Sequence, residues 1–188
     1  MRGLRAVVGL GNPGPAYAAT RHNAGFWVLA RLIGRARWRK QRYPWGEIYR
    51  AEEGLLLRPL TFMNRAGEAA RELLRRFPLS PADLLVVYDD VDLPVGELRL
   101  RRRGGPGTHN GMRSVLAALG SEEVPRLRIG VGAPSPGTDL SRYVLSPPAP
   151  EEVSVLAEAA DRAAQLAWVF LREGLEAALD EYSRQGRV

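Results

Sequence analysis

The sequence predicts one α/β domain over residues 1–188, with a mixed β-sheet and a helical C-terminal end. Short apolar runs typical of strands alternate with segments whose apolar residues recur at helical spacing. The run Leu84–Tyr88 (LLVVY) has the strongest buried-strand pattern in the chain. No internal repeat divides the 188 residues, which are enough for one domain with a sizeable core.

The first element is a short apolar strand, Ala6–Val8, which runs into a glycine-rich turn. A polar segment follows and extends to Asn23, and a helix pattern over Ala24–Leu32 begins directly after it. A strand that ends in a polar, glycine-rich loop is a typical site location in open α/β sheets. We therefore expect the functional site to include residues 9–25.

The next elements include a basic stretch, Arg35–Arg42, which we interpret as a solvated helix end and loop rather than a nucleic-acid contact. Two strands follow, Glu47–Ala51 and Leu55–Leu60, with a hinge at Gly54. A helix is then predicted over Ala66–Phe77, because alanine, leucine and glutamate favour helices.

The second half of the chain repeats this alternation. Its predicted elements are the strand Leu84–Tyr88, the half-exposed strand Glu97–Arg101, a glycine-rich loop over Arg103–Gly111, the helix Met112–Leu119, the strand Arg126–Val131 and a loop over Gly132–Gly137. From Glu151 to Arg184 the pattern is helical and amphipathic, with an interruption expected near Gly174.

Composition limits the possible functions. The chain has no cysteine, which excludes disulfides, thiol nucleophiles and thiolate metal sites. No apolar run reaches the length of a membrane span and no signal-peptide pattern is present, so we expect a cytoplasmic protein, and nothing demands more than a monomer. Residues 1–148 carry 23 Lys and Arg against 13 Asp and Glu, whereas residues 149–188 carry 4 against 8. This imbalance favours an anionic partner for the basic body.

The two histidines, His22 and His109, both lie in polar glycine-rich loops, and each is followed by asparagine. A catalytic histidine needs a partner that fixes its tautomer and stabilises its charged form. The acidic residues after Leu84–Tyr88 offer such a partner, although two of them can equally form a solvated turn: Asp89, Asp90 and Asp92. His22 would then activate water as a general base, because no serine lies in a nucleophile-elbow context.

Two other site types are poorly supported. With two histidines and no H-x-x-x-H spacing, we expect no metal and no cofactor. The loop Gly9–Gly14 matches the G-x-G-x-x-G pattern of dinucleotide-binding proteins. However, it does not open a helix directly, and no acidic residue occurs between Gly14 and Glu47.

All four asparagines lie at strand ends or in loops: Asn12, Asn23, Asn64 and Asn110. Their amides could hold a peptide backbone, orient water or stabilise an oxyanion, and they could equally cap loops. Arginines gather on the strands Glu97–Arg101 and Arg126–Val131, where they could bind phosphates or form a solvated sheet face.

Together these stretches resemble bacterial peptidyl-tRNA hydrolases. The matching segments, which lie in family order, are GLGNPGPAYAATRHNAG at 9–25, RPLTFMNRAG at 58–67, DDVDLPVGELRLRRRGGPGTHNG at 89–111 and RLRIGVG at 126–132. The resemblance implies a three-layer α/β fold around a twisted, mostly parallel mixed sheet. It also implies hydrolysis of the ester between a peptide and tRNA, without a covalent intermediate.

The resemblance implies a role for each matching residue. His22 matches the catalytic base, and Asp89 matches the carboxylate that orients it. The residues that match the substrate cleft are Asn12, Tyr17, Asn23, Met63, Asn64 and Asn110. The residues that match the tRNA phosphate contacts are Arg99, Arg101 and Arg128.

The chain departs from the family pattern at a few positions. Ala66 replaces a common serine, Pro106 and Thr108 interrupt a loop that is usually richer in glycine, and arginine replaces lysine at 99 and 101. None of these changes removes a proposed catalytic group. Two alternatives stay open: a non-catalytic RNA-binding protein on the same fold, and a nucleotide-binding enzyme that uses the Gly9–Gly14 loop.

Overall fold

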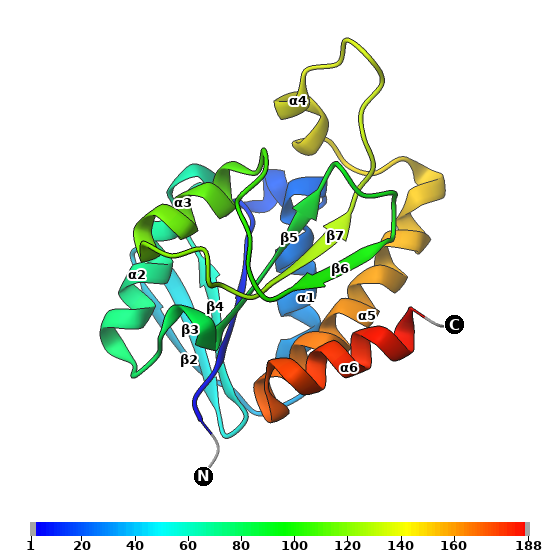
Figure 1. Ribbon diagram of the computed structural model, residues 1–188. Helices are drawn as coiled ribbons and strands as arrows, with labels where there is room; N and C mark the ends of the chain where they lie inside the picture. The colour runs from blue at the N-terminus through cyan, green and yellow to red at the C-terminus, as the bar shows by residue number, and fades with distance from the viewer. Residues whose placement is uncertain (1–2, 187–188) are drawn as a thin grey trace.

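The computed structural model describes residues 3–186, and within them seven strands form one twisted sheet (Figure 1). The strand order is β2-β3-β4-β1-β5-β7-β6. The central strands β4, β1, β5 and β7 are parallel, whereas β2–β3, β3–β4 and β6–β7 are antiparallel pairs. The bounds are β1 (Ala6–Gly9), β2 (Arg39–Tyr43), β3 (Gly46–Ala51), β4 (Gly54–Pro59), β5 (Leu84–Asp90), β6 (Leu98–Arg101) and β7 (Arg126–Gly130).

Helices α1 (Ala24–Ile33), α5 (Pro150–Glu173) and α6 (Leu175–Gln185) cover one face of the sheet (Figure 1). Their apolar side chains pack on alternate strand residues such as Val7 and Leu85, because successive side chains of a strand point to opposite faces. The predicted interruption near Gly174 is confirmed. This glycine separates α5 from α6 with a φ of 95°, which residues with a Cβ rarely adopt.

Helices α2 (Ala66–Arg76) and α3 (Asn110–Leu119) cover the opposite face. They pack against the other set of strand residues, including Val8 and Val86, and against each other. The three layers confirm the predicted α/β fold with a mixed sheet and a helical C-terminal end. None of the helices in the described residues is long and apolar enough to cross a membrane.

Two segments differ from the sequence-based expectations. Residues 39–42, expected in a loop, belong to the edge strand β2, whose hydrogen bonds to β3 form although its side chains are exposed. Tertiary pairing here overrides a weak strand pattern. The short helix α4 (Leu140–Val144) was not expected inside a segment rich in Gly, Pro and Ser, and the Asp139 side chain caps it by accepting from the Ser141 N–H.

Candidate active site

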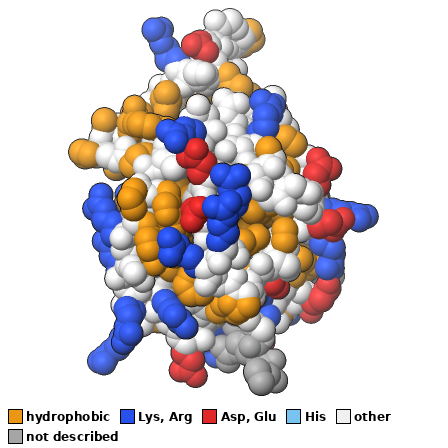
Figure 2. All heavy atoms as spheres, turned by 90° about the vertical axis from the view of Figure 1, so that its left-hand side faces the viewer, with side chains coloured by type: hydrophobic (Ala, Val, Ile, Leu, Met, Phe, Trp, Pro, Cys, Tyr) orange, Lys and Arg blue, Asp and Glu red, His pale blue; other side chains and the backbone are white. Residues whose placement is uncertain are grey.

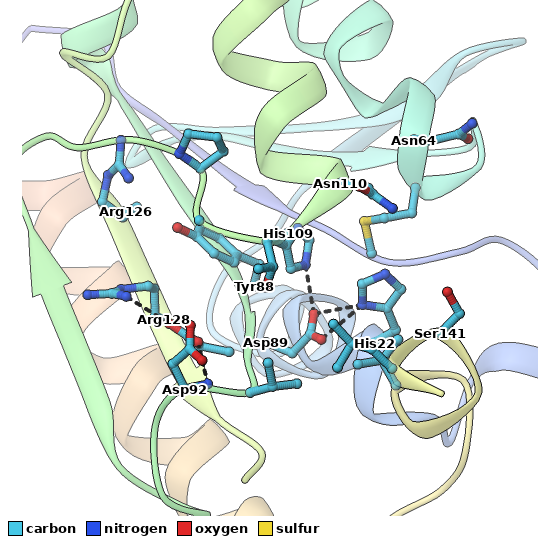
Figure 3. Close-up of a pocket in the computed structure, with 18 of the residues that line it drawn as sticks. His22, Asn64, Tyr88, Asp89, Asp92, His109, Asn110, Arg126, Arg128 and Ser141 are labelled. Carbon is cyan, nitrogen blue, oxygen red and sulfur yellow. Dashed lines mark hydrogen bonds and ion pairs between the residues drawn. The ribbon is translucent and has the colours of Figure 1, made fainter. Parts of the chain in front are cut away.

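A cleft of about 600 Å³ opens at the carboxyl ends of the central strands. Strand β1 pairs with β4 on one side and β5 on the other, so the connections from these strands diverge at β1. Such a switch point leaves a crevice beyond the strand ends. The cleft is lined by the loops that follow β1, β4 and β5, by the loop before α3, and by α4. Figure 3 shows the side chains that meet there.

The predicted pair of His22 and Asp89 is brought together in this cleft. His22 lies in the 3₁₀ turn η2 (Arg21–Asn23), and Asp89 is the sixth residue of β5. The distance from His22 Nδ1 to Asp89 Oδ2 is 2.9 Å. The Asp89 side chain is 1% exposed and that of His22 is 13% exposed, so the carboxylate is buried behind an accessible imidazole.

A third member of the site, His109, was not assigned a role from the sequence. Its Nε2 lies 2.9 Å from Asp89 Oδ1, so the carboxylate stands between two imidazoles (Figure 3). Its Nδ1 accepts a hydrogen bond from the N–H of Met112 and caps α3. The sequence feature that could have indicated this residue is the repeated His-Asn dipeptide, because both histidines precede an asparagine in a polar, glycine-rich loop.

The hydrogen bonds leave only one of the two imidazoles with a nitrogen that can accept a proton. Because His109 Nδ1 accepts from Met112, its Nε2 carries a proton and donates to Asp89, so both of its nitrogens are occupied. His22 Nδ1 also donates to Asp89, which leaves His22 Nε2 as an acceptor. In the described part of the chain no group binds this Nε2, so it is available to take a proton from water.

Asp89 is kept ionised by its neighbours. Burial by itself would raise the pKa of the carboxyl, but the electrostatic attraction and hydrogen bonds of the His109 and His22 imidazoles outweigh burial and hold that pKa well below its usual range. The ligand atoms of these three side chains lie within 4.8 Å of one another, a spacing that could suit a metal. An ion there would have to displace the imidazole protons that now bind both carboxylate oxygens.

Asn12 and Asn23 lie next to this group and have different environments. Asn23 is buried outside the cleft lining, and its side chain binds the backbone N–H and C=O of Asn12. Asn12 lines the cleft, and its Oδ1 accepts from the N–H of Met63 at 2.8 Å. That bond leaves the Asn12 NH₂ group as a fixed donor for the cleft.

The other residues that the family resemblance assigned to the substrate cleft form the rim of this cleft. Tyr17, Met63, Asn64 and Asn110 all line it, and both asparagines are exposed. Four apolar side chains that were not singled out in the sequence extend this rim: Phe62, Leu140, Val144 and Leu145. Tyr17 and Phe62 pack edge to face with their ring centroids 6.2 Å apart. The rim therefore combines neutral amides with an apolar surface.

The arginines on β6 and β7 share one face of the sheet. Register places Arg99 opposite Arg128 and Arg101 opposite Arg126, and the intervening leucines pack in the core on the other face. Arg101 and Arg128 line the cleft, whereas Arg99 does not. Arg128 forms an ion pair with Asp90 at 2.8 Å. Basic side chains are spread over the face shown in Figure 2.

Arg126 has a structural role, because it holds a loop in place. It is buried, and its guanidinium donates to the carbonyls of Val124, Gly104 and Gly105, so it braces the loop before α3. Burial lowers the pKa of this guanidinium. Alternation puts Arg126 and Arg128 on the same face, so only the family resemblance, which matched Arg128 alone, distinguished them.

The glycines of the Gly9–Gly14 loop serve packing. A Cβ at Gly9 would lie 2.5 Å from the carbonyl oxygen of Gly25, and a Cβ at Gly11 would lie 2.7 Å from the Phe26 ring. Because neither glycine has a side chain, α1 can pack closely against the sheet at both positions. The chain continues into the 3₁₀ turn η1 (Pro15–Tyr17) rather than into an α-helix. This geometry gives the dinucleotide-binding hypothesis no support.

The fold and the cleft define the class: an α/β protein with a carboxylate-bound imidazole at the switch point of its sheet, beside a basic sheet face. The chain belongs to the peptidyl-tRNA hydrolase family, since the model of that family, described as Peptidyl-tRNA hydrolase, matches residues 6–187.

Relatives over nearly the full length support this assignment. A peptidyl-tRNA hydrolase from Symbiobacterium thermophilum is 46% identical over 195 residues, covering 95% of this chain and 98% of the relative. One from Chloroflexus aggregans is 47% identical, covering 94% and 97%. The crystal structure of peptidyl-tRNA hydrolase from Acinetobacter baumannii has a TM-score of 0.87 at 33% identity, covering 95% of this chain and 93% of that one.

Proposed function

We propose that this protein hydrolyses the ester bond between a peptide, or another N-blocked aminoacyl group, and tRNA, and so releases free tRNA for reuse in translation. The observation that carries this proposal is the free Nε2 of His22, held at the cleft by Asp89 in a chain of this family. A non-catalytic RNA-binding protein would be expected to have this pair missing or blocked. Both residues are present, and within the described residues His22 Nε2 has no hydrogen-bond partner.

In the proposed mechanism His22 Nε2 takes a proton from a water molecule. The resulting hydroxide attacks the ester carbonyl, and the ribose oxygen leaves with a proton returned from the imidazolium. Asp89 stabilises that imidazolium through its hydrogen bond to Nδ1. His109 cannot serve as the base, because both of its nitrogens are already hydrogen-bonded.

We assign the oxyanion contact to the NH₂ group of Asn12, whose oxygen is committed to the N–H of Met63. Tyr17, Met63, Asn64 and Asn110 would hold the peptide and the 3′ end of the tRNA. Asn23 would act on the substrate indirectly, by fixing the backbone of Asn12.

We further propose that Arg101 and Arg128 bind tRNA phosphates, with Arg99 beside them on the strand. Phosphate contacts give affinity and register without reading the base sequence. We infer that residues 1–188 act as one domain, since both apolar layers pack on the same sheet, and that the protein works in the cytoplasm as a monomer.

The test is release of tRNA from N-acetyl-aminoacyl-tRNA by the wild type and by His22→Ala. Loss of a general base typically lowers the rate about 10²- to 10⁴-fold, and the variant should keep the wild-type fold. Near-normal turnover by His22→Ala would exclude this base. An inactive wild type that still binds tRNA tightly would favour the non-catalytic RNA-binding alternative.

A further inference from the structure

Arg21, which directly precedes His22, is a buried arginine that reaches away from the catalytic group. Its Nη1 donates to the Tyr143 carbonyl at 3.1 Å, and its Nη2 lies 3.3 Å from Glu152 Oε1. Its guanidinium carbon lies 3.9 Å above the centre of the Tyr143 ring. The backbone N–H of Arg21 also donates to the Ser146 carbonyl at 3.1 Å. Arg21 therefore contacts both the segment that joins β7 to α5 and the first turn of α5.

That segment forms one wall of the cleft. Residues 135–142 are exposed without interruption, and Figure 1 shows α4 and its preceding loop standing away from the helical layers. Leu140, Ser141 and Val144 nevertheless line the cleft, with Ser141 near His22 in Figure 3. Besides Arg21, the hydroxyl of Tyr143 holds α4 close to the end of β7 by donating to the carbonyl of Val131, the residue that follows this strand, at 2.8 Å.

We propose that Arg21 is a positioning residue that holds the α4 wall, through Tyr143 and Glu152, at a fixed distance from His22. The proposal rests on the proposed function, because it assigns this wall to the peptide-bearing end of the substrate. Arg21 sits in the same 3₁₀ turn as His22, so any displacement of the wall relative to Arg21 is a displacement relative to the base.

An arginine suits this position for a physical reason. Its planar guanidinium can stack on the Tyr143 ring while its N–H groups donate in the plane to a carbonyl and a carboxylate. A lysine would keep the charge but could not combine stacking with two directed bonds. Glu152 Oε1 also accepts from the N–H of Ala149, so the same carboxylate fixes the start of α5.

The effect of a loosened wall on KM and kcat depends on how the wall would contact the substrate. Its apolar side chains would bind substrate equally in the ground state and in the transition state, so loosening the wall should raise KM with little change in kcat. The wall lies apart from the arginines of β6 and β7. The increase should therefore be the same for a full peptidyl-tRNA and for a short 3′-nucleotidyl ester.

The experiment compares Arg21→Gln, Arg21→Lys and Tyr143→Leu with Arg162→Gln as the control. Arg162 is also partly buried and donates to a backbone carbonyl, that of Gly96, but it does not line the cleft. We expect KM to rise about tenfold in Arg21→Gln and less in Arg21→Lys, with kcat within about threefold and an unchanged pH profile. Arg162→Gln should keep the wild-type KM.

A double variant tests whether Arg21 and Tyr143 act through one contact. In Arg21→Gln combined with Tyr143→Leu, the rise in KM should be smaller than the product of the two single rises, because both changes remove the same stacking contact. Multiplied effects would overturn the proposal. So would a lower Tm with unchanged KM, which would mean a purely structural role, or a shifted pH profile with unchanged KM, which would mean that Arg21 acts on the base.

Amide hydrogen exchange separates this proposal from the proposed function. Exchange over residues 139–146 should be faster in Arg21→Gln than in Arg162→Gln, whether or not the wild type hydrolyses the ester. Equal exchange in the two variants would overturn the positioning role. Absence of hydrolysis by the wild type, with faster exchange in Arg21→Gln, would instead overturn the proposed function alone.

Discussion

At the scale of single residues, Asp89 defines the site because it accepts from two imidazoles at once. The difference between these imidazoles comes from their other nitrogens. His109 uses its second nitrogen to cap α3, whereas His22 leaves its second nitrogen open to the cleft. Two residues of the same type are thereby given different chemistry by one backbone N–H, that of Met112.

Replacing Asp89 by asparagine should be far more damaging than replacing its exposed neighbour Asp92. An amide is uncharged, so it cannot stabilise the His22 imidazolium as the carboxylate does, and its NH₂ group would face an imidazole N–H. We expect kcat of Asp89→Asn to fall on the order of 10²- to 10⁴-fold. Asp92→Asn, measured under the same conditions, should stay near the wild type, and equal losses would show that the wrong carboxylate is assigned.

His109 should affect both activity and stability, and two variants separate these effects. His109→Ala removes a donor to Asp89 and the cap of α3, so kcat should fall about tenfold and the free energy of unfolding by about 1 to 3 kcal/mol. His109→Asn keeps a good capping oxygen but cannot reach Asp89 as Nε2 does. It should recover most of the stability in urea denaturation, with kcat still reduced. Recovery of both would assign His109 to capping alone.

The lowered pKa of Asp89 also predicts how stability depends on pH. A carboxyl whose pKa is lower in the folded state stabilises the fold above its unfolded pKa of about 3.9, and this contribution is lost as pH falls through the folded value. The stability difference between wild type and Asp89→Asn should therefore shrink as pH falls below about 4. Urea denaturation at several pH values measures it. A difference that grows over this acidic range would contradict the assigned direction.

At the scale of elements, the contact of α1 with the sheet fixes the loop that carries His22. Gly25 allows this contact, since a Cβ there would lie 2.4 Å from both Leu10 N and Val87 O. Because the nearest atoms belong to the backbone, neither can move cheaply, and overpacking of this kind costs about 1 to 3 kcal/mol or more.

Gly25→Ala should therefore lower the free energy of unfolding and reduce kcat, because the displaced helix begins immediately after η2. Gly34→Ala is the matched control. Gly34 lies at the other end of α1, where a Cβ would meet its nearest atom at 3.5 Å, an ordinary contact. Thermal unfolding and turnover of the two variants give the comparison. Similar Tm values would refute the tight contact at Gly25.

At the scale of the whole molecule, charge is divided between the faces and ends of the fold. The acidic residues of the last forty positions belong to α5 and α6, which pack on the sheet face opposite to the one that carries Arg99 and Arg101. The basic strip on β6 and β7 is therefore distant from most of the acidic side chains of the C-terminal helices. This arrangement favours a tRNA orientation in which phosphates meet the strip and the ester enters the cleft.

The double variant Arg99→Ala with Arg101→Ala tests this orientation. KM should rise for full tRNA substrates more than for a short nucleotidyl ester, and the dependence of KM on salt should become weaker, because fewer counterions are released. Arg102→Ala with Arg184→Ala is the control, since these arginines pair with Glu176 and Glu181 and do not line the cleft. An unchanged salt slope in the first variant would move the tRNA surface elsewhere.

The class of fold and the location of the site could be predicted from the amino-acid pattern. Apolar runs and helical spacing predicted nearly every strand and helix, because burial imposes a period on the sequence. Polar side chains directly after the strands at Ala6 and Leu84 predicted the edge at which His22 and Asp89 meet, because parallel strands end at a common edge.

The pairing of these groups could not be predicted, because it depends on the packing of distant segments. Asp89 and His109 are 20 residues apart, and Asp89 and His22 are 67 apart, so their contact depends on strand order and loop conformation. For the same reason the alternating pattern could not show that Arg126 is buried, or single out Arg21. Local pattern reports whether a side chain is buried or exposed, whereas the partner that a buried polar group finds is fixed by the packing of distant segments.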